Sequence, residues 1–341
     1  MRTVTPGPAR TYGATTTSFP LVALALGLLP LQLFALPLAL LPRHAGWGWL
    51  LVPLALTNTP LWSLTHESIH GSLVRGRDFN DRLGRALAIG YGAPFALLKT
   101  GHLLHHRFSR TPRERTEVFD PGVTTWRRQA PAYYVRLLGG LYLAEVSSVL
   151  LLFVPRGGWL ALARRLDSPS TVSAQLFETV AARRLAAFRV DAALIVLVYA
   201  AGFAAYGHYW WMLLAALGGR ALIVSVADNA YHYGTELDAP LEAMNLWLPR
   251  ALETFILAFN LHGVHHKYPG LAWHSLRAAF LADGGRFDLG WFAALARQAA
   301  GPIPVPALLE MTRVVEEAPQ PDREDRRAGT CRCPGPMPTP H

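Results

Sequence analysis

The sequence predicts an all-α integral membrane protein, and its composition and long uncharged runs are the observations that predict it. Apolar residues make up 51% of the 341 residues and charged residues only 16%, whereas soluble proteins carry about 25% charged residues. The mean hydropathy is +0.21. We expect two transmembrane helical hairpins, about four spans. Interfacial or re-entrant helices and a cytoplasmic histidine-rich cap should complete the fold.

The first predicted hairpin consists of two apolar runs near the N-terminus. Residues 19–41 contain no charged side chain, and about 20 mainly apolar residues suffice to cross a bilayer. The prolines in this run are tolerated in lipid-embedded helices, because neighbouring groups satisfy the backbone atoms that they free. A short loop with Arg43 leads into the second run, residues 47–64.

The second predicted hairpin consists of residues 190–206 and 209–227, joined at Gly207-His208. Tryptophans beside that turn suit the aromatic belt at a membrane surface. Arg220 lies inside the last run. We expect its side chain either to snorkel from near a helix end or to face protein rather than lipid.

Two further apolar stretches, residues 83–98 and 137–154, have less regular patterns. The first is interrupted by glycines and a proline, and the second carries Glu145 near its middle. If the histidine motifs described below share one side of the membrane, the number of crossings between them must be even. We therefore expect residues 137–154 to be re-entrant or interfacial.

The distribution of basic residues predicts the orientation. From His66 to Arg189 there are 18 Lys and Arg residues, whereas the Gly207-His208 turn has none. By the positive-inside rule this region and both termini are cytoplasmic. Arginine far outnumbers lysine, and Ala, Leu and Gly are abundant, which favours a bacterial inner membrane. The net charge of +9 then faces lipid headgroups, and no nucleic-acid binding is expected because no compact reader module is present.

These patterns divide the chain into three parts. Residues 1–18 form an N-terminal cytoplasmic segment, residues 19–311 the membrane domain, and residues 312–341 a flexible tail rich in Pro, Arg and Glu. The two cysteines, Cys331 and Cys333, lie in that tail. They are too few to hold an iron–sulfur cluster, which needs four ligands.

Nine of the 13 histidines fall into four short motifs. One motif has histidines four residues apart, which places both rings on one face of a helix. The pattern His-x-x-His-His occurs twice, and one further histidine follows the last apolar run, four residues after Asp228. Such clustering predicts metal ligands. The predicted ligands are His66, His70, His102, His105, His106, His232, His262, His265 and His266.

The ligand count predicts two metal ions, because nine imidazoles exceed the four or five that one zinc accepts. Imidazole suits iron, copper, zinc and nickel, and a pair of irons can activate dioxygen. The segment His66-Glu67-Ser-Ile-His70 also matches a zinc protease motif, but such a protease has no role for the two His-x-x-His-His motifs. A metal transporter would place its ligands near the bilayer midplane, whereas these motifs occur in polar segments.

Over residues 60–280, roughly, the chain resembles the membrane fatty acid desaturase family. The resemblance is carried by His66-Glu-Ser-Ile-His70-Gly, His102-Leu-Leu-His-His106 and Asn260-Leu-His-Gly-Val-His-His266. It implies a non-haem di-iron centre completed by His232, O2 as co-substrate, and a C=C bond formed in an acyl chain. The first motif looks closer to acyl desaturases than to alkane hydroxylases or carotenoid ketolases. A di-iron membrane hydroxylase, ketolase or acetylenase is the alternative.

The resemblance also implies partners. The acyl substrate is expected on an acyl-carrier protein, on coenzyme A or in a membrane lipid. Electrons are expected from a separate donor, such as ferredoxin or cytochrome b5 with its reductase. A basic surface of arginines either docks such a partner or contacts lipid headgroups; its members are Arg75, Arg77, Arg82, Arg110, Arg113 and Arg115. The polar side chains expected to orient the metal-binding rings are Glu67, Asp120, Asp228 and Asn260.

Overall fold

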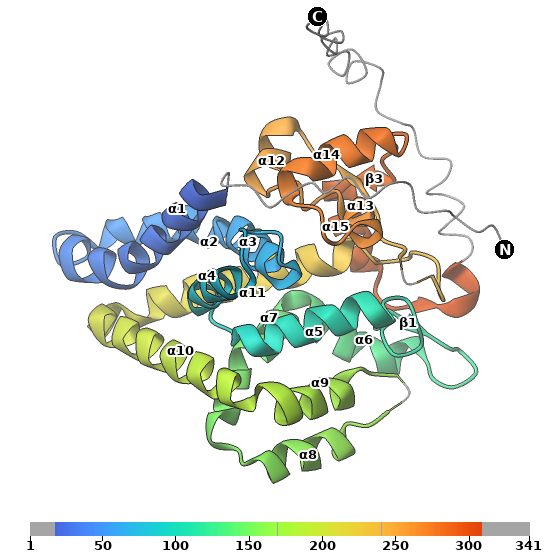
Figure 1. Ribbon diagram of the computed structural model, residues 1–341, viewed down its shortest axis with the longest axis horizontal. Helices are drawn as coiled ribbons and strands as arrows, with labels where there is room; N and C mark the ends of the chain where they lie inside the picture. The colour runs from blue at the N-terminus through green and yellow to red at the C-terminus, as the bar shows by residue number, and fades with distance from the viewer. Residues whose placement is uncertain (1–17, 169, 240, 309–341) are drawn as a thin grey trace, which may run out of the picture.

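The computed structural model describes residues 18–168, 170–239 and 241–308, and this part of the chain is mostly helical (Figure 1). Up to residue 153 the helices are α1 (Phe19–Pro30), η2 (Leu31–Leu40), η3 (Ala45–Leu50), α2 (Leu51–Leu56), α3 (Asn58–His70), α4 (Arg77–Tyr91), α5 (Phe95–Phe108), α6 (Trp126–Val135), η4 (Arg136–Gly140), α7 (Leu141–Ser147) and η5 (Ser148–Phe153). The later helices are α8 (Arg156–Arg165), α9 (Ser173–Thr179), η6 (Val180–Arg184), α10 (Leu185–Tyr206), η7 (Gly207–Tyr209), α11 (Trp210–Ala230), α12 (Arg250–Phe255), α13 (His262–Lys267), α14 (Trp273–Ala282), α15 (Trp291–Arg297) and η8 (Gln298–Ala300). Of the two predicted terminal segments, only Ser18 lies within the described residues.

Within the described residues, three helical stretches are long and apolar enough to cross a membrane: residues 19–40, 126–153 and 173–230. The third has 58 residues, which at 1.5 Å per residue is about 87 Å and too long for one crossing. It turns back at Gly207, whose φ of 52° is accessible to glycine without strain. This turn joins α10 to α11 where the sequence predicts the second hairpin. The protein is an integral membrane protein.

The arms of the first predicted hairpin differ from each other. α1 and η2 form one continuous apolar helix, whereas residues 47–64 are divided among η3, α2 and α3, with an interruption at Thr57. The first arm of this predicted hairpin is therefore one long helix, and the second arm is broken into shorter helices. The number of membrane crossings stays a prediction.

The stretch from residue 126 to residue 153 is helical but kinked. Leu138 and Gly139 have non-helical backbone angles between α6 and α7. Glu145, the carboxylate that makes this stretch unusual, accepts a hydrogen bond from the Tyr91 hydroxyl at 2.6 Å, so it faces α4 rather than lipid. Because its length and composition allow a crossing, the re-entrant arrangement of residues 137–154 is still a prediction.

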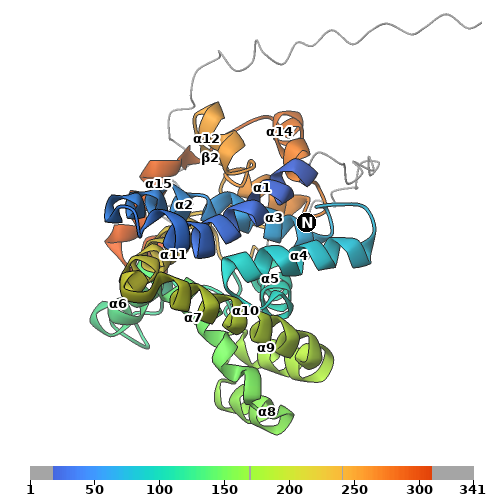
Figure 2. The same cartoon turned by 90° about the vertical axis from the view of Figure 1, so that its left-hand side faces the viewer.

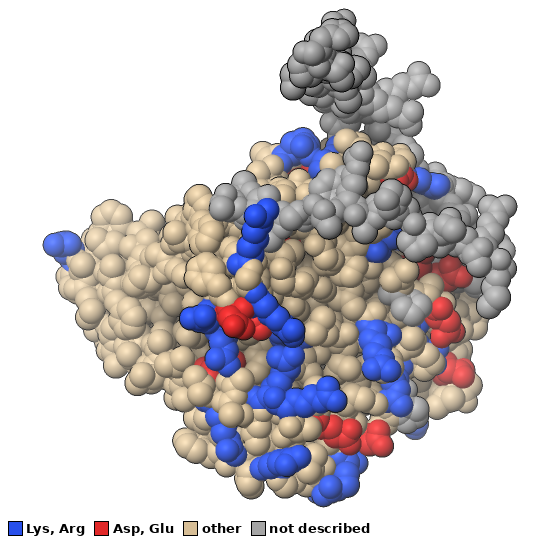
Figure 3. Space-filling model, viewed as in Figure 1, with Lys and Arg blue, Asp and Glu red and all other residues tan. Residues whose placement is uncertain are grey.

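The apolar half of the molecule is packed by aliphatic side chains. η2 lies against α10, and α2 lies against α11. The shared core includes Leu33, Leu36, Tyr206 and Leu213. Figure 3 shows that charged side chains gather over α4, α5, α8 and α9, whereas the ends of α1, α10 and α11 show almost none on this face. That contrast is expected where one half meets lipid and the other meets water and headgroups.

The helices after α11 pack at one end of the molecule, where α12 and α14 lie far from α8 and α9 (Figures 1 and 2). Two pairs of two-residue parallel strands anchor this region, and the all-α prediction misses them. β1 (Val118–Phe119) pairs with β4 (Ile303–Pro304), and β2 (Leu246–Trp247) pairs with β3 (Leu289–Gly290). These two strand pairs attach the segments around residues 118 and 246 to the C-terminal part of the described chain.

Candidate metal centre

The predicted ligands come from four places in the fold. α3 carries His66 and His70 at its C-terminal end, and α5 carries His102, His105 and His106. His232 lies in the turn directly after α11, and α13 consists largely of the third motif. The motifs lie at helix ends, so they bring rings together from segments that are up to 200 residues apart in sequence.

The structure brings all nine histidines together, in two groups. The ligand nitrogens of each group lie within 4.8 Å of one another. The first group is His66, His70, His102, His106 and His265, and the second is His105, His232, His262 and His266. The consecutive residues His105 and His106 join different groups because neighbouring positions on a helix point about 100° apart. Each of the two His-x-x-His-His motifs thus contributes to both groups.

The spacing of the ring nitrogens fits metal coordination. In the first group the Nε2 atoms of His70 and His102 are 2.9 Å apart, and those of His106 and His265 are 3.0 Å apart. In the second group the Nε2 atoms of His262 and His266 are 3.2 Å apart. Two nitrogens bound about 2.1 Å from one ion at a right angle lie about 3.0 Å apart. The residues present therefore fit two ions.

Two further nitrogens support this fit. The Nε2 atoms of His66 and His232 are buried, and neither has a hydrogen-bond partner within the described part of the chain. A buried nitrogen without a partner is costly unless it binds something. Burial lowers the pKa of His66, His102 and His265, and it lowers that of His70 to about 4. These rings are neutral at pH 7, and the neutral imidazole is the form that binds metal.

His105 differs because it contacts a carboxylate. Its Nδ1 lies 2.8 Å from Oε1 of Glu114. Burial acts to lower the pKa of His105, but the Glu114 carboxylate more than offsets this and raises it. The Nδ1–H group therefore donates to Glu114, which leaves Nε2 for a metal and fixes the ring orientation. The sequence analysis misses Glu114, because it lies in an arginine-rich loop that resembles a solvated segment.

Glu67, one of the four predicted orienting residues, makes no hydrogen bond to a histidine ring within the described part of the chain. Its Oε2 accepts hydrogen bonds from the backbone N–H of Trp273 and from the Ser72 hydroxyl, each at 3.1 Å. Burial raises the pKa of Glu67 to about 7. The carboxyl group ties the end of α3 to the start of α14, and so it holds the first motif against the segment that follows the third.

The other three predicted orienting residues have different surroundings. Asn260 is fully buried, and its Nδ2 donates to the Leu246 carbonyl at 2.8 Å, which fixes the backbone before the third motif. Asp228 interacts electrostatically with His105 but makes no hydrogen bond to it in the described residues. Asp120 is exposed, and its Oδ1 accepts a hydrogen bond from the backbone N–H of Gly122. Asp120 thus stabilises a turn, and the structure does not bring it to the histidines.

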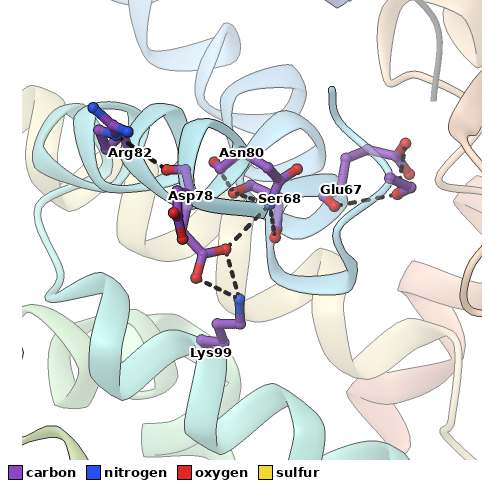
Figure 4. Close-up of polar contacts among 8 residues, drawn as sticks. Glu67, Ser68, Asp78, Asn80, Arg82 and Lys99 are labelled. Carbon is purple, nitrogen blue, oxygen red and sulfur yellow. Dashed lines mark hydrogen bonds and ion pairs between the residues drawn. The ribbon is translucent and has the colours of Figure 1, made fainter. Parts of the chain in front are cut away.

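A polar network connects the first two motifs through α4 (Figure 4). Ser68, between the two histidines of α3, donates to the Asn80 carbonyl at 2.8 Å, and Asn80 Nδ2 donates back to the Ser68 carbonyl at 2.7 Å. The next residue, Asp81, pairs with Lys99 at 2.7 Å. Lys99 lies on α5, three residues before His102. The network therefore sets the position of α3 relative to α5.

One of the six arginines predicted to form the basic surface is buried instead. Arg110 is 1% exposed; it pairs with Glu117, and its Nη2 donates to the Thr235 carbonyl at 2.7 Å. Its prediction as a surface residue is wrong because an arginine in a polar loop gives no sequence signal of its buried partner. Arg110 instead joins the loop after α5 to the segment after His232.

The comparisons with known proteins agree with this geometry. The model of the fatty acid desaturase family matches residues 44–289, well over half of the chain. The search of curated proteins found no match to this chain. The matched region includes all nine clustered histidines, the helices that carry them and the hairpin of α10 and α11. This match, together with two groups of histidines that could each hold a metal ion, shows that the chain belongs to the fatty acid desaturase family.

Proposed function

We propose that this chain is an O2-dependent membrane fatty acyl desaturase that introduces a C=C bond into an acyl chain, using two iron ions and an external electron donor. The observation that carries the proposal is the division of nine imidazoles into a group of five and a group of four. Imidazole suits iron, and two groups this close together can hold a pair of ions. Membership of the desaturase family gives the reaction class.

The position of Glu67 argues against a zinc protease built on His66-Glu67-Ser-Ile-His70. In such an enzyme the glutamate is the general base and must reach the metal-bound water. Here its Oε2 is occupied by the Trp273 N–H and the Ser72 hydroxyl. A structural role for this carboxyl group is consistent with a desaturase, in which the first motif needs only its histidines.

A pair of irons, when bound, would provide the chemistry that oxidises an unactivated C–H bond, with O2 as the oxidant and electrons from the donor. The chain contributes position and surroundings. His66, His262 and His265 are at most 4% exposed, so the chain shields these ligands from water. Glu114 keeps a proton on Nδ1 of His105, so that Nε2 stays available as a ligand. The linked helices α3 and α5 hold two of the motifs at fixed separation.

The proposal includes a place for the enzyme and its partners. The histidines and both termini face the cytoplasm of a bacterial cell, and the chain lies in the inner membrane. The acyl group arrives on an acyl-carrier protein, on coenzyme A or in a membrane lipid. Ferredoxin, or cytochrome b5 with its reductase, supplies the electrons. Arg75, Arg77 and Arg82 are exposed near the first motif, where they suit an acidic partner or lipid headgroups.

The test compares lipids and free fatty acids from cells that express the wild type with those that express His265→Ala. His265 belongs to the group of five, so its loss should abolish oxidation. Mass spectrometry should find products lighter by two hydrogens only with the wild type. Products heavier by one oxygen would instead assign the chain to the hydroxylases. If the purified wild type, supplied with reductant and acyl substrate, binds no iron and consumes no O2, the proposal is wrong.

A further inference from the structure

A partly open cavity of about 310 Å³ lies in the apolar half of the molecule, between α1, α3 and α12. Its walls are mainly leucine side chains, including Leu21, Leu28 and Leu61. The polar groups that line it include Arg220 and Gln32. Small-molecule sites typically have this form, with an apolar lining and a few convergent polar groups. The volume is at the lower end of their range, which suits one extended chain better than a two-chain lipid.

Arg220 is a cation in an apolar setting. It lies within α11 and is only 4% exposed, so it faces protein rather than lipid. Its Nη1 donates to the Gly90 carbonyl at 3.2 Å and to the Tyr199 hydroxyl at 3.4 Å, and its Nη2 donates to Oε1 of Gln32. All three acceptors are uncharged, and so is the Tyr142 hydroxyl, which also hydrogen-bonds the guanidinium. Among the described residues no carboxylate forms an ion pair with Arg220.

Two donor groups at this place have no acceptor. Nε of Arg220 and Nε2 of Gln32 are both buried without a hydrogen-bond partner in the described part of the chain. Buried charges in proteins are normally paired, and an ionisable residue at membrane depth is usually kept for a specific partner. The missing partner is therefore an anion with at least two acceptor atoms. The surrounding leucines require that the rest of it be apolar.

We propose that this cavity binds the anion of a long-chain fatty acid, with its carboxylate on Arg220 and Gln32. Nε of Arg220 can donate a charge-assisted hydrogen bond to one carboxylate oxygen, and Nε2 of Gln32 can donate to the other. The alkyl chain lies along the leucines of α1 and α3. About 15 Å of α11 separates Arg220 from Ala230, near the metal centre. The proposed position of the carboxylate is therefore separate from the metal centre.

The experiment measures binding of radiolabelled palmitate and of hexadecanol, which has the same chain but no charge, to the full-length metal-loaded protein in detergent. We expect the wild type to bind palmitate about tenfold to a hundredfold more tightly, because only the acid forms charged hydrogen bonds. Arg220→Gln should bind the two ligands equally. Equal binding of both by the wild type, or an unchanged preference in Arg220→Gln, would overturn the proposal.

A second pair of variants covers the case in which Arg220→Gln does not fold. Leu28→Trp fills the cavity while it leaves the guanidinium in place, and it should weaken binding of both ligands. Leu197→Trp is the control, because Leu197 lies on α10, is 67% exposed and does not line the cavity. It should bind like the wild type. Unimpaired palmitate binding by Leu28→Trp would place the ligand elsewhere. Tighter binding of hexadecyl phosphate than of palmitate would reassign the ligand as a phosphate.

Discussion

The apolar half of the molecule and its histidine-bearing helices are stabilised by different interactions. Around η2, α10 and α11, aliphatic side chains pack closely, as where an added Cβ at Gly202 would lie 3.2 Å from Leu33. Around α3, α5 and α13, hydrogen bonds and ion pairs are added to the apolar contacts, among them Ser68 with Asn80 and Asp81 with Lys99. The aliphatic packing of α10 against η2 needs no metal ion. The polar contacts surround histidine nitrogens that still lack partners.

This difference indicates that the two regions depend on metal to different degrees. Nine imidazoles packed with nitrogens about 3 Å apart gain little from one another, since each neutral ring offers one donor and one acceptor. Metal ions would replace those close approaches with coordinate bonds. The free energy of metal binding is then free energy of folding for the helices that carry the ligands. The aliphatic packing of α10 against η2 has no such dependence.

The largest expected effect follows from removing the metal. In the chelator-treated protein, hydrogen exchange of backbone amides in α3, α5 and α13 should accelerate by up to about a thousandfold. That factor corresponds to about 4 kcal/mol, the stabilisation by a ligand present at a thousand times its Kd. Amides in α10 and α11 should change little. Exchange measured by mass spectrometry, before and after iron is restored, checks both regions in one sample.

A uniform loss of protection would contradict the comparison, because it would mean that the whole molecule depends on the metal. Unchanged exchange in α3, α5 and α13 would show instead that the histidine-bearing helices are rigid without it. Re-addition of iron should reverse the effect in α13 as fully as in α3, because each of these helices contributes ligands.

A smaller effect is expected from the carboxylate that orients His105. Glu114→Gln keeps the size of the side chain but removes the charge that holds the Nδ1 proton. Loss of such an orienting partner typically lowers metal affinity or activity about 10-fold to 100-fold. Competition with a chromogenic chelator measures the affinity. Glu67→Gln is the matched control, since Glu67 is buried but bonds only a backbone N–H and a serine.

The control should retain iron nearly as well as the wild type. If Glu67→Gln loses as much iron affinity as Glu114→Gln, any buried carboxylate near the histidines would affect iron binding equally. The specific role of Glu114 in orienting His105 would then be disproved. If neither variant loses affinity, the orientation of His105 does not depend on its carboxylate.

The sequence predicts the features that depend on local pattern. The hairpin at Gly207-His208 follows from two uncharged runs around a glycine, and the histidines follow from their spacing along helices. The division of His105 and His106 between two groups does not follow, because it depends on how α5 is rotated against α3 and α13. Whether the nine residues bind metal stays a prediction until ions are measured.

Other features depend on contacts that are distant in sequence. The Tyr91–Glu145 hydrogen bond connects residues 54 positions apart, so the pattern of residues 137–154 alone gives no sign of it. Glu114 and Arg110 lie in one polar loop, and only the fold shows that one contacts a histidine and the other a buried glutamate. Asp120 lies in the same part of the chain but turns to solvent. Charged residues in loops are therefore the least predictable part of the site.

The smallest expected effect concerns the packing of α4 against the histidine-bearing helices α3 and α5. At Gly84 in α4, an added Cβ would lie 2.1 Å from Oγ of Ser68 and 2.6 Å from the ring of Phe95. Ser68 cannot turn away without breaking its hydrogen bond to Asn80. Gly84→Ala should therefore push α4 from α3 and α5 and destabilise the protein by about 1–3 kcal/mol.

Gly90→Ala, on the same helix, is the matched control. Its added Cβ would meet Leu61 no closer than 3.7 Å, an ordinary contact, and alanine favours a helix over glycine by up to about 1 kcal/mol. Thermal unfolding in detergent should give a lower Tm for Gly84→Ala and an equal or higher one for Gly90→Ala. Iron content should fall only in Gly84→Ala, because only that change disturbs the spacing of His70 and His102. Equal iron content in the two variants would show that the metal ligands, and not the polar network through α4, determine the distance between α3 and α5.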